Sequence, residues 1–474
     1  MGRAAVFLDR DGTLIEDRGA IRDPSQVAFY PETIDALRRL GGQFPLFIVT
    51  NQSWIAQGVL RVEEAATVNA FIVRRLAEEG IEIREVYTCP HAREDGCECH
   101  KPRPLFLRRA ARDHGVDLSR SFVVGDHPAD VELAAATGAH GIYLLTGHGE
   151  KHRAELSVLC DVRPGIAAAV DTIAARHGAR VLRKGGLAAF PTETVYGLGA
   201  DASNPAAARR VFAVKGRPAT HPLIVHLADA AALPEWAAEV PGTARLLADR
   251  FWPGPLTLIL RKSPRVPDEV TGGQDTVGLR VPSHPLALEL IRTFGGGVAA
   301  PSANRFGRVS PTTAAHVRED LGADADFVLD GGPCAVGVES TIVDCSSAAP
   351  LILRPGGVPR EAIEALLGRP VPVAAQSDVR APGQLESHYA PRAEVIVVRP
   401  DELQERAAQL ERRGLKVAVL ETPDAANLYS RLREADREGA GAILVTLPPE
   451  EGLGLAIVDR LRKAAGPRLT STGP

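Results

Sequence analysis

Three short apolar runs in the first 150 residues are each followed by acidic or small polar residues, and this pattern restricts the fold. The runs, VFL (6–8), LFIV (46–49) and FVV (122–124), are typical of buried parallel strands, and helical segments separate them. Such alternation predicts a doubly wound α/β domain. The residues that follow or end these runs are Asp9, Asp11, Thr50, Asn51 and Asp126.

These polar residues are expected to converge in space. In open parallel sheets, ligands bind beyond the carboxyl ends of the strands. The three carboxylates would repel one another there without a hard cation, and Mg²⁺ prefers oxygen ligands of this kind. A single DxD motif would be explained equally well by solvated loop acids. Three such motifs in order, together with Lys101, favour a catalytic magnesium site.

The segment CPHAREDGCECH (89–100) concentrates metal-ligating residues in a short loop. Its four ligands would be Cys89, His91, Cys97 and Cys99. This set is typical of a closed tetrahedral zinc site, which has no open position for chemistry. We therefore expect structural zinc that holds the loop and orients Lys101, with free thiols or another metal as the alternatives. Six cysteines in a chain of this length do not predict a disulfide framework and favour a reducing cytoplasm.

The motifs DRDGT, TNQS, Lys101 and GDHPAD resemble the haloacid dehalogenase superfamily over about residues 1–175. The resemblance implies that Asp9 attacks a phosphate monoester to form an aspartyl phosphate, and that Asp11 acts as general acid and base. Mg²⁺ would be held by the carboxylates of Asp9 and Asp126 and by the backbone carbonyl of Asp11. The residues that would hold the phosphoryl oxygens are Thr50, Asn51 and Lys101.

The cysteine-rich insert is similar to that of heptose-bisphosphate and histidinol phosphatases. Three positions depart from that pattern: Trp54 replaces a glycine, and Gln57 and His100 replace arginines. The loss of two cations near the substrate weakens the case for a bisphosphate. The sequence therefore predicts a phosphomonoesterase without naming its substrate.

The second half of the chain carries a different series of motifs. They include PTETVYGLGADA, VKGRPATHPLIVHL, FWPGP, GLRVP, PSAN, GVESTIVD and LRPGG. Together they resemble the YrdC-like threonylcarbamoyl-AMP synthases, and SHYAP (387–391) matches the longer two-domain form of that family. The resemblance implies synthesis of threonylcarbamoyl-AMP and pyrophosphate from L-threonine, bicarbonate and ATP, with Mg²⁺ assisting.

Chemical arguments agree with the residues that this resemblance transfers. Phosphates require fixed cations, and a carboxylate favours a bidentate arginine such as Arg280. The residues expected on the nucleotide side are Lys215, Arg217, His221, Thr276, Ser302, Ser310, Arg354 and Tyr389. Those expected on the threonine side are Thr194, His226, Arg280, Ala300 and Ser340.

Length and composition limit the remaining alternatives. A chain of 474 residues is expected to form about three domains, and its net charge of −4 does not favour a stable nucleic-acid complex. No apolar run is long enough to cross a bilayer, and the N-terminus does not resemble a signal peptide, so we expect a cytoplasmic protein without a membrane partner. The expected parts are a phosphatase domain (1–175) with its zinc loop (89–99), a synthase domain (176–368), a linker or lid (369–391) and a small Rossmann-like α/β domain (392–474).

The leading hypothesis is a bifunctional α/β enzyme, in which a doubly wound phosphatase domain precedes a twisted-sheet synthase domain. Its substrates would be threonine, bicarbonate, ATP and a phosphomonoester, and tRNA-modification proteins could act downstream. The alternative is an RNA-binding YrdC-like module fused to a catalytically silent scaffold.

Overall fold

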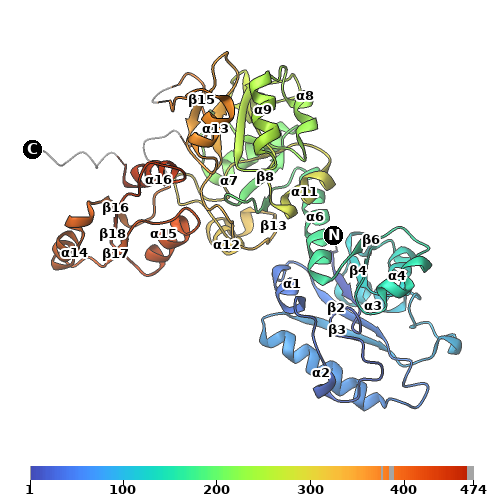
Figure 1. Cartoon of the computed structure of the whole chain (residues 1–474). Coiled ribbons are helices and arrows are strands. Elements are labelled where there is room, and N and C mark those ends of the chain that lie inside the picture. The colour runs from blue at the N-terminus through green and yellow to red at the C-terminus, as the bar shows by residue number, and fades with distance from the viewer. Residues whose placement is uncertain (1, 375–376, 384–388, 467–474) are drawn as a thin grey trace, which may run out of the picture. The chain divides into compact units, whose positions relative to one another are not determined.

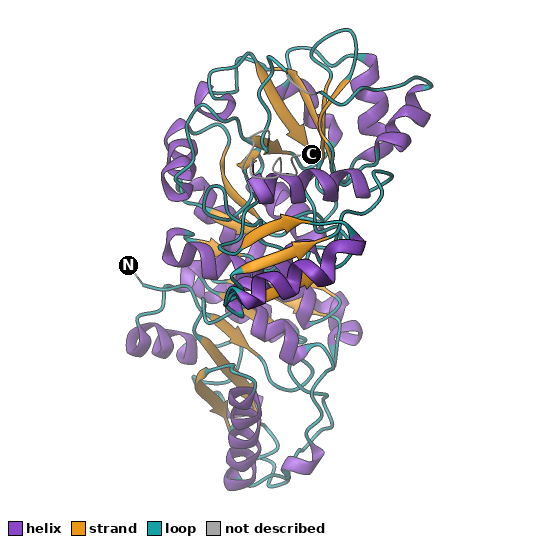
Figure 2. Cartoon of the chain, turned by 90° about the vertical axis from the view of Figure 1, so that its left-hand side faces the viewer, coloured by secondary structure: helices purple, strands orange, loops and turns teal. Residues whose placement is uncertain are grey.

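The structure is a computed structural model that describes residues 2–374, 377–383 and 389–466 (Figure 1). It divides into two compact units, Met1–Ala174 and Ala175–Pro474. Within the described ranges, no helix has both the length and the apolar character needed to cross a membrane. Mixed helices and strands in both units confirm the predicted α/β class (Figure 2).

The first unit is built on a six-stranded parallel sheet with the order β3-β2-β1-β4-β5-β6. Chain order reverses on either side of β1, and ligands bind at such switch points in open parallel sheets. The predicted strands at 6–8, 46–49 and 122–124 are therefore confirmed. The full set is β1 (Val6–Leu8), β2 (Leu46–Asn51), β3 (Ile83–Cys89), β4 (Phe122–Gly125), β5 (His140–Leu144) and β6 (Asp161–Arg163).

Amphipathic helices connect these strands. In α2, Val68, Ile72 and Leu76 recur every four residues and are buried, as expected for a helix with one face on a core. Helix α4 begins after His127, whose ring accepts a hydrogen bond from a backbone N–H of the first turn, and ends at Gly138. The connecting helices are α1 (Thr33–Arg39), α2 (Val62–Glu78), α3 (Leu105–His114), α4 (Pro128–Thr137) and α5 (Gly149–His152). Helix α6 (Ile166–Arg183) follows β6 and extends past Ala174, the last residue of this unit.

The second unit contains a mixed nine-stranded sheet with the order β13-β7-β8-β12-β9-β11-β10-β14-β15. Its strands are β7 (Ala188–Phe190), β8 (Gly197–Asp201), β9 (Ile224–His226), β10 (Leu256–Arg261), β11 (Thr276–Arg280), β12 (Val298–Ala300), β13 (Phe327–Val328), β14 (Thr341–Asp344) and β15 (Leu351–Arg354). Its helices are α7 (Pro205–Lys215), α8 (Leu233–Trp236), α9 (Gly242–Phe251), α10 (Asp268–Thr271), α11 (Pro285–Phe294), α12 (Ala314–Leu321) and α13 (Arg360–Leu367). The buried side chains of Leu198, Trp236 and Leu258 belong to its core.

A small parallel sheet of order β16-β18-β17 completes the second unit and agrees with the α/β fold predicted for the C-terminal part. Its elements are β16 (Glu394–Val397), α14 (Leu403–Arg412), β17 (Val417–Leu420), α15 (Leu428–Arg437), β18 (Ala442–Val445) and α16 (Gly454–Ala465). Leu428 and Leu461 share a buried cluster with Val195, Val309 and Val338. The C-terminal segment therefore packs directly on the nine-stranded part.

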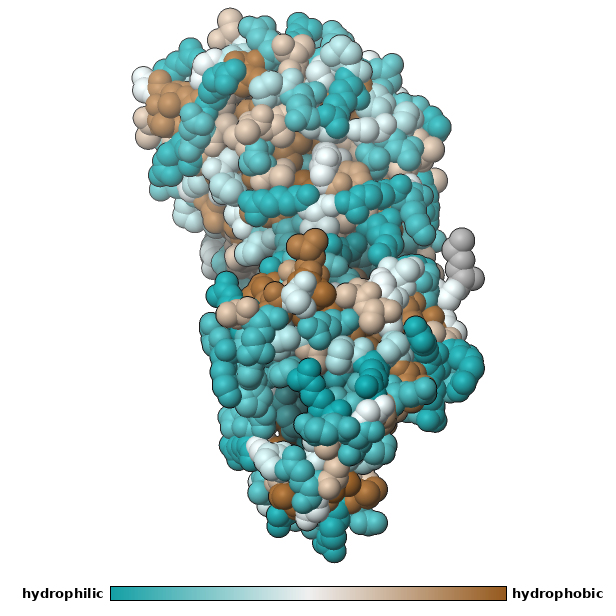
Figure 3. All heavy atoms as spheres, turned by 90° about the vertical axis from the view of Figure 1, so that its right-hand side faces the viewer, coloured by the Kyte–Doolittle hydropathy of each residue, from teal (hydrophilic) through white to brown (hydrophobic). Residues whose placement is uncertain are grey.

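Apolar side chains are mostly internal. On the face drawn in Figure 3, hydrophobic residues gather in small groups among hydrophilic ones. The large hydrophobic side chains that are exposed in the described ranges are Trp54, Val62, Leu105, Leu159, Leu246 and Val419. These residues are scattered along the chain, as in most folded proteins.

Candidate active sites

The strand-end residues of the first unit meet in one pocket of about 420 Å³. They meet because β2, β1 and β4 are parallel neighbours, so Thr50, Asp9 and Asp126 lie at the same edge of the sheet. The predicted residues that line the pocket are Asp9, Asp11, Thr50, Asn51, Lys101 and Asp126. The geometry therefore brings together all the residues predicted for phosphate transfer.

Lys101 is the central cation of this pocket. Its buried Nζ lies 2.5 Å from Asp9 Oδ1 and 2.6 Å from Asp130 Oδ1, and it donates to the Val49 carbonyl at 3.0 Å. Burial acts to lower the pKa of Lys101, but the carboxylates of Asp130 and Asp9 outweigh it and hold that pKa above its usual value. The ammonium therefore stays charged beside the predicted nucleophile.

Asp9, Asp126 and Asp130 present carboxylate oxygens within 4.8 Å of one another. Burial raises the pKa of Asp9 to about 6, although Lys101 opposes the shift. Burial and the charges of Asp9 and Asp130 raise the pKa of Asp126 to about 8. Three buried carboxylates are fully ionised at neutral pH only with more positive charge nearby, so this donor set fits Mg²⁺. Asp130 was not predicted from the sequence.

Asp11 is held apart from this cluster. The guanidinium of the fully buried Arg10 binds both of its carboxylate oxygens at 2.8–3.2 Å, and Gln52 donates to it at 2.8 Å. Arg10 also donates to Asn69 Oδ1 at 2.8 Å. The sequence pattern did not indicate a role for Arg10 or Gln52, although Arg10 lies between the two predicted catalytic aspartates.

Position 12 requires glycine because two chain segments approach each other closely there. The φ of Gly12 is +80°, and a Cβ at this position would lie 2.1 Å from Asp126 Oδ2. A side chain here would displace the Asp126 carboxylate.

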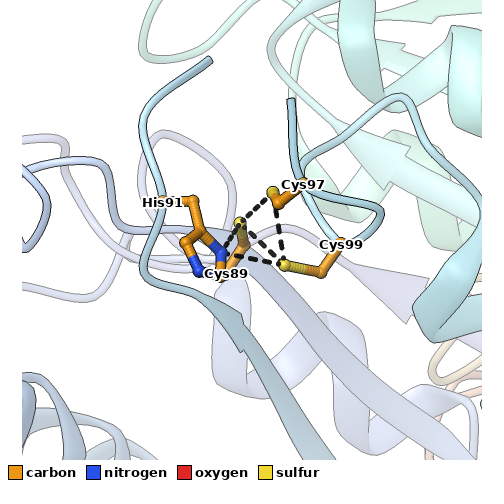
Figure 4. A group of neighbouring side chains, drawn as sticks. All are labelled: Cys89, His91, Cys97 and Cys99. Atoms are coloured by element: carbon orange, nitrogen blue, oxygen red, sulfur yellow. Dashed lines mark hydrogen bonds between the residues drawn. The ribbon is translucent and has the colours of Figure 1, made fainter. Parts of the chain in front are cut away.

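The four predicted zinc ligands form one cluster at the end of β3 (Figure 4). The three sulfur atoms are 3.2–3.7 Å apart, and His91 Nδ1 lies 3.3 Å from Cys99 Sγ and 3.8 Å from Cys89 Sγ. Tetrahedral zinc with bonds of about 2.3 Å to sulfur separates its ligand atoms by similar distances. The spacing of this donor set therefore fits zinc.

The loop that follows the cluster fixes Lys101. The Lys101 backbone N–H donates to Asn51 Oδ1 at 3.1 Å, and a ring nitrogen of His100 lies 2.8 Å from the Lys101 carbonyl oxygen. Arg103 donates back to the Cys97 carbonyl. These side-chain-to-backbone contacts join the segment around Lys101 to Asn51 on one side and to Cys97 of the cluster on the other.

A second pocket, of about 50 Å³, lies in the nine-stranded part of the chain. Nine predicted synthase residues from separate segments line it: Thr194, Arg217, His226, Arg280, Ala300, Ser302, Ser340, Arg354 and Tyr389. Neighbouring strands β12, β9 and β11 bring Ala300, His226 and Arg280 together. Ser387 and His388 of the SHYAP motif lie outside the described residues.

Lys215 lies beside the pocket and does not line it. It is the last residue of α7, which ends at Gly216 with φ +64°. Its Nζ donates to the Ser302 carbonyl at 2.6 Å and to the Asn304 carbonyl. Burial and the charge of Arg217 hold its pKa well below the usual value. The contacts of Lys215 therefore support the PSAN turn rather than an open phosphate position.

Three other residues predicted for the nucleotide side are also absent from the pocket lining: His221, Thr276 and Ser310. The ring of His221 packs edge-on against Phe306 at 5.6 Å. Thr276 begins β11, at the opposite end of that strand from Arg280. The hydroxyl of Ser310 donates to Glu339 at 2.6 Å, so it contacts the pocket wall.

Two buried arginines supply positive charge to this pocket. Arg217 donates to the Pro222 carbonyl, and Arg354 donates to the carbonyls of Ser340 and Pro382. No ion pair joins either arginine to a carboxylate of the described chain within 4.0 Å. Burial lowers the pKa of Arg217 to about 10, so both side chains are desolvated cations suited to an anionic ligand.

Arg280 has a carboxylate partner that the motif alone did not identify. Its Nη2 donates to Glu193 Oε1 at 2.7 Å, and Glu193 Oε2 accepts the Ser283 backbone N–H at 3.0 Å. Nearby, His226 is buried, and within the described chain its Nδ1 has no hydrogen-bond partner. A small polar ligand could bind the His226 nitrogen with a hydrogen-bonding group and Arg280 with a negatively charged group.

The low pKa of His226 predicts acid sensitivity in this unit. Burial and the Arg280 charge lower that pKa to about 3, whereas unfolded histidine binds a proton near pH 6.5. The unfolded state thus binds more protons between these values, so stability should fall as pH decreases below about 6.5, by at most about 1.4 kcal/mol per pH unit. His226→Gln should flatten this dependence in denaturant unfolding at pH 7, 6 and 5; an unchanged slope would contradict the prediction.

Comparison with known proteins extends these observations. Residues 180–356 match a family described as telomere recombination, 358–466 match the C-terminal domain of threonylcarbamoyl-AMP synthase, and 98–176 match a HAD-hydrolase-like family. Threonylcarbamoyl-AMP synthases from Pyrococcus abyssi and Bacillus subtilis are 45% and 42% identical, over alignments that cover 62% of this chain and 94% and 93% of those proteins.

Two solved structures are also similar to parts of this chain. The crystal structure of P. abyssi Sua5 complexed with L-threonine has a TM-score of 0.59 and 45% identity, and the match covers 61% of this chain and 94% of that one. A D,D-heptose 1,7-bisphosphate phosphatase from B. bronchiseptica, complexed with magnesium and phosphate, is 30% identical with a TM-score of 0.34, covering 36% of this chain and 97% of that one. The family matches confirm both resemblances predicted from the sequence.

Proposed function

Because this chain belongs to the threonylcarbamoyl-AMP synthase family, we propose that its second pocket joins L-threonine, bicarbonate and ATP into threonylcarbamoyl-AMP and releases pyrophosphate. The observation that carries this proposal is the convergence of nine predicted residues on one pocket with two desolvated arginines. The product would serve the first step of threonylcarbamoyladenosine formation in tRNA.

The residues divide by chemistry. Arg217 and Arg354 neutralise the phosphates of ATP, and Arg280 binds the carboxylate of threonine. The neutral threonine amine condenses with bicarbonate to form a carbamate and water. A carbamate oxygen then attacks the α-phosphorus, and pyrophosphate leaves. The charged groups of the pocket hold these reactants together and stabilise the developing charge, so no covalent nucleophile is required.

Pyrophosphate release tests this function directly. The purified full chain with ATP and Mg²⁺ should release pyrophosphate only when both threonine and bicarbonate are present, and mass spectrometry should detect the adenylate. Salt-sensitive tRNA binding without pyrophosphate release would instead support the RNA-binding alternative.

We further propose that the first unit is a Mg²⁺-dependent phosphomonoesterase. Asp9 attacks phosphorus and the alcohol leaves with a proton from Asp11; Asp11 then activates water, which hydrolyses the aspartyl phosphate. Lys101 and the Thr50 and Asn51 side chains hold the phosphoryl oxygens. Asp9, Asp126 and the Asp11 carbonyl would hold Mg²⁺, and Asp130 is positioned to join them, so that the metal supplies charge neutralisation at the phosphate.

We propose that Cys89, His91, Cys97 and Cys99 bind structural zinc. Loss of this ion should lower phosphatase activity by about 10- to 100-fold, because the loop would no longer fix Lys101. Cys97→Ser should reproduce the loss and reduce zinc content measured by elemental analysis, while Cys160→Ser, outside the cluster, should change neither. Full phosphatase activity in zinc-free Cys97→Ser would contradict the structural role.

A further inference from the structure

A buried carboxylate forms part of the nucleotide pocket and makes an ion pair with a cation from helix α16. Glu339 lines the pocket and is only 6% exposed. It accepts hydrogen bonds from Ser310 Oγ at 2.6 Å, from the Tyr429 hydroxyl at 2.8 Å and from Arg460 Nε at 2.8 Å. Tyr429 lies on α15 and Arg460 on α16, so the C-terminal segment supplies two of the three donors.

The charge of Glu339 is significant because the pocket is proposed to bind a polyanion. Burial acts to raise the pKa of Glu339, but Arg460 and Arg354 outweigh it and lower that pKa to about 2. The carboxylate therefore remains ionised and would repel phosphates if it were unpaired. Arg460, which is 1% exposed, pairs with Glu339 through Nε and with Asp459 through Nη1, and Lys463 also pairs with Asp459. The two cations of α16 thus balance the two carboxylates and leave Arg217 and Arg354 available for ATP.

Arg460 also supports Tyr389, another residue of the pocket. Its guanidinium carbon lies 5.0 Å from the centre of the Tyr389 ring, and that ring stacks on Tyr429 at 5.9 Å. Tyr389 has φ +63°, which is rare for residues with a side chain and persists only where surrounding contacts hold it. The Arg460 and Tyr429 side chains provide such contacts.

A second cation of α16 reaches the other side of the same region. Lys463 Nζ donates to the Gly383 carbonyl at 2.7 Å and pairs with Asp459. Gly383 lies against the Tyr389 hydroxyl, since a Cβ there would be 2.4 Å from it. Arg460 and Lys463 are three residues apart and share one face of the helix. That face therefore contacts both Gly383 and Tyr389.

We propose that Arg460 is a positioning residue for adenylate formation: it neutralises Glu339 and supports Tyr389, so that α16 completes the nucleotide side of the pocket. This inference rests on the proposed synthase function. It predicts a specific defect in ATP use, because the altered groups lie on the nucleotide side while Arg280 and His226 are unchanged.

The test compares four full-length variants by steady-state pyrophosphate release. Arg460→Gln should raise KM for ATP about 10- to 100-fold, because it leaves Glu339 ionised and unpaired, and should change KM for threonine less than about threefold. Arg460→Lys should retain most of the ATP affinity. Glu339→Gln combined with Arg460→Gln should recover most of the loss, since the buried charge is then absent. Arg462→Gln, an exposed arginine of α16 paired with Glu450, is the control and should resemble the wild type.

Two further measurements and one replacement variant separate a folding defect, a failure of the synthase proposal and a failure of the Arg460 proposal. Thermal unfolding establishes that each variant is folded, and if Arg460→Gln is not, Lys463→Met tests the same helix through Gly383. Calorimetry with a non-hydrolysable ATP analogue measures nucleotide affinity without turnover, so a wild type that binds it but releases no pyrophosphate would refute the synthase proposal alone. Equal ATP parameters in the wild type and folded Arg460→Gln, or equal losses for ATP and threonine, would overturn the role of Arg460.

Discussion

Asp9→Asn should eliminate phosphomonoester hydrolysis, with a decrease in kcat on the order of 10⁴-fold or more, because an amide cannot form the acyl phosphate. Asp9 lies against Lys101, in a buried cluster with Asp126 and Asp130. The measurement is phosphate release from a panel of phosphomonoesters with Mg²⁺.

Two controls make this result specific. Asp35→Asn changes an aspartate whose side chain is 80% exposed on α1, and it should leave hydrolysis intact. Threonine-dependent pyrophosphate release should be equal in the wild type and Asp9→Asn, since Asp9 and the second pocket belong to different units. Hydrolysis that persists in Asp9→Asn would contradict the role of Asp9 as nucleophile, and a wild type that hydrolyses none of the substrates would support the silent scaffold.

The second large effect is expected for Arg280→Gln, which should raise KM for threonine by about 100-fold or more. Two changes act in the same direction. The threonine carboxylate loses its cationic partner. In addition, the Glu193 carboxylate, which pairs with Arg280 at 2.7 Å in the wild type, becomes unpaired and repels the threonine carboxylate. The measurement is the dependence of pyrophosphate release on threonine concentration at saturating ATP and bicarbonate.

Arg261→Gln is the matched control for this variant. Arg261 ends the neighbouring strand β10, its side chain is 57% exposed, and it pairs with Asp275, so its loss should change KM for threonine little. Adding Glu193→Gln to Arg280→Gln should recover part of the defect by removing the repulsion. A rise in KM for ATP without one for threonine would show that Arg280 faces the nucleotide instead.

The pocket of the first unit was largely predictable because its residues belong to local motifs with a simple spatial rule. Asp9, Thr50 and Asp126 each end a strand or follow it, and parallel neighbours bring such positions to one edge. Asp130 was missed although it lies in the quoted GDHPAD motif. Its position four residues after Asp126, in the first turn of α4, was the available signal.

Interactions between distant segments were not predictable in this way. Glu339 and Arg460 are 121 residues apart, and each alone is an ordinary charged residue in its element. Lys215 illustrates the opposite case: a lysine beside predicted phosphate ligands suggested a phosphate contact, but its ammonium is held by carbonyls of the PSAN turn. Residue type indicates which partners a side chain can take, and only the packed chain decides which it reaches.

Gly12 illustrates how intolerance to substitution can arise without any chemical role. Its backbone passes so close to the Asp126 carboxylate that even one added methyl group would occupy the same space. In a saturation mutagenesis library selected for hydrolysis, position 12 would therefore resemble a reactive position, although glycine offers no functional group. Variants at position 12 would be depleted because a side chain there overlaps a neighbouring group. Variants at Asp9 and Asp11 would be depleted because these residues take part in the reaction.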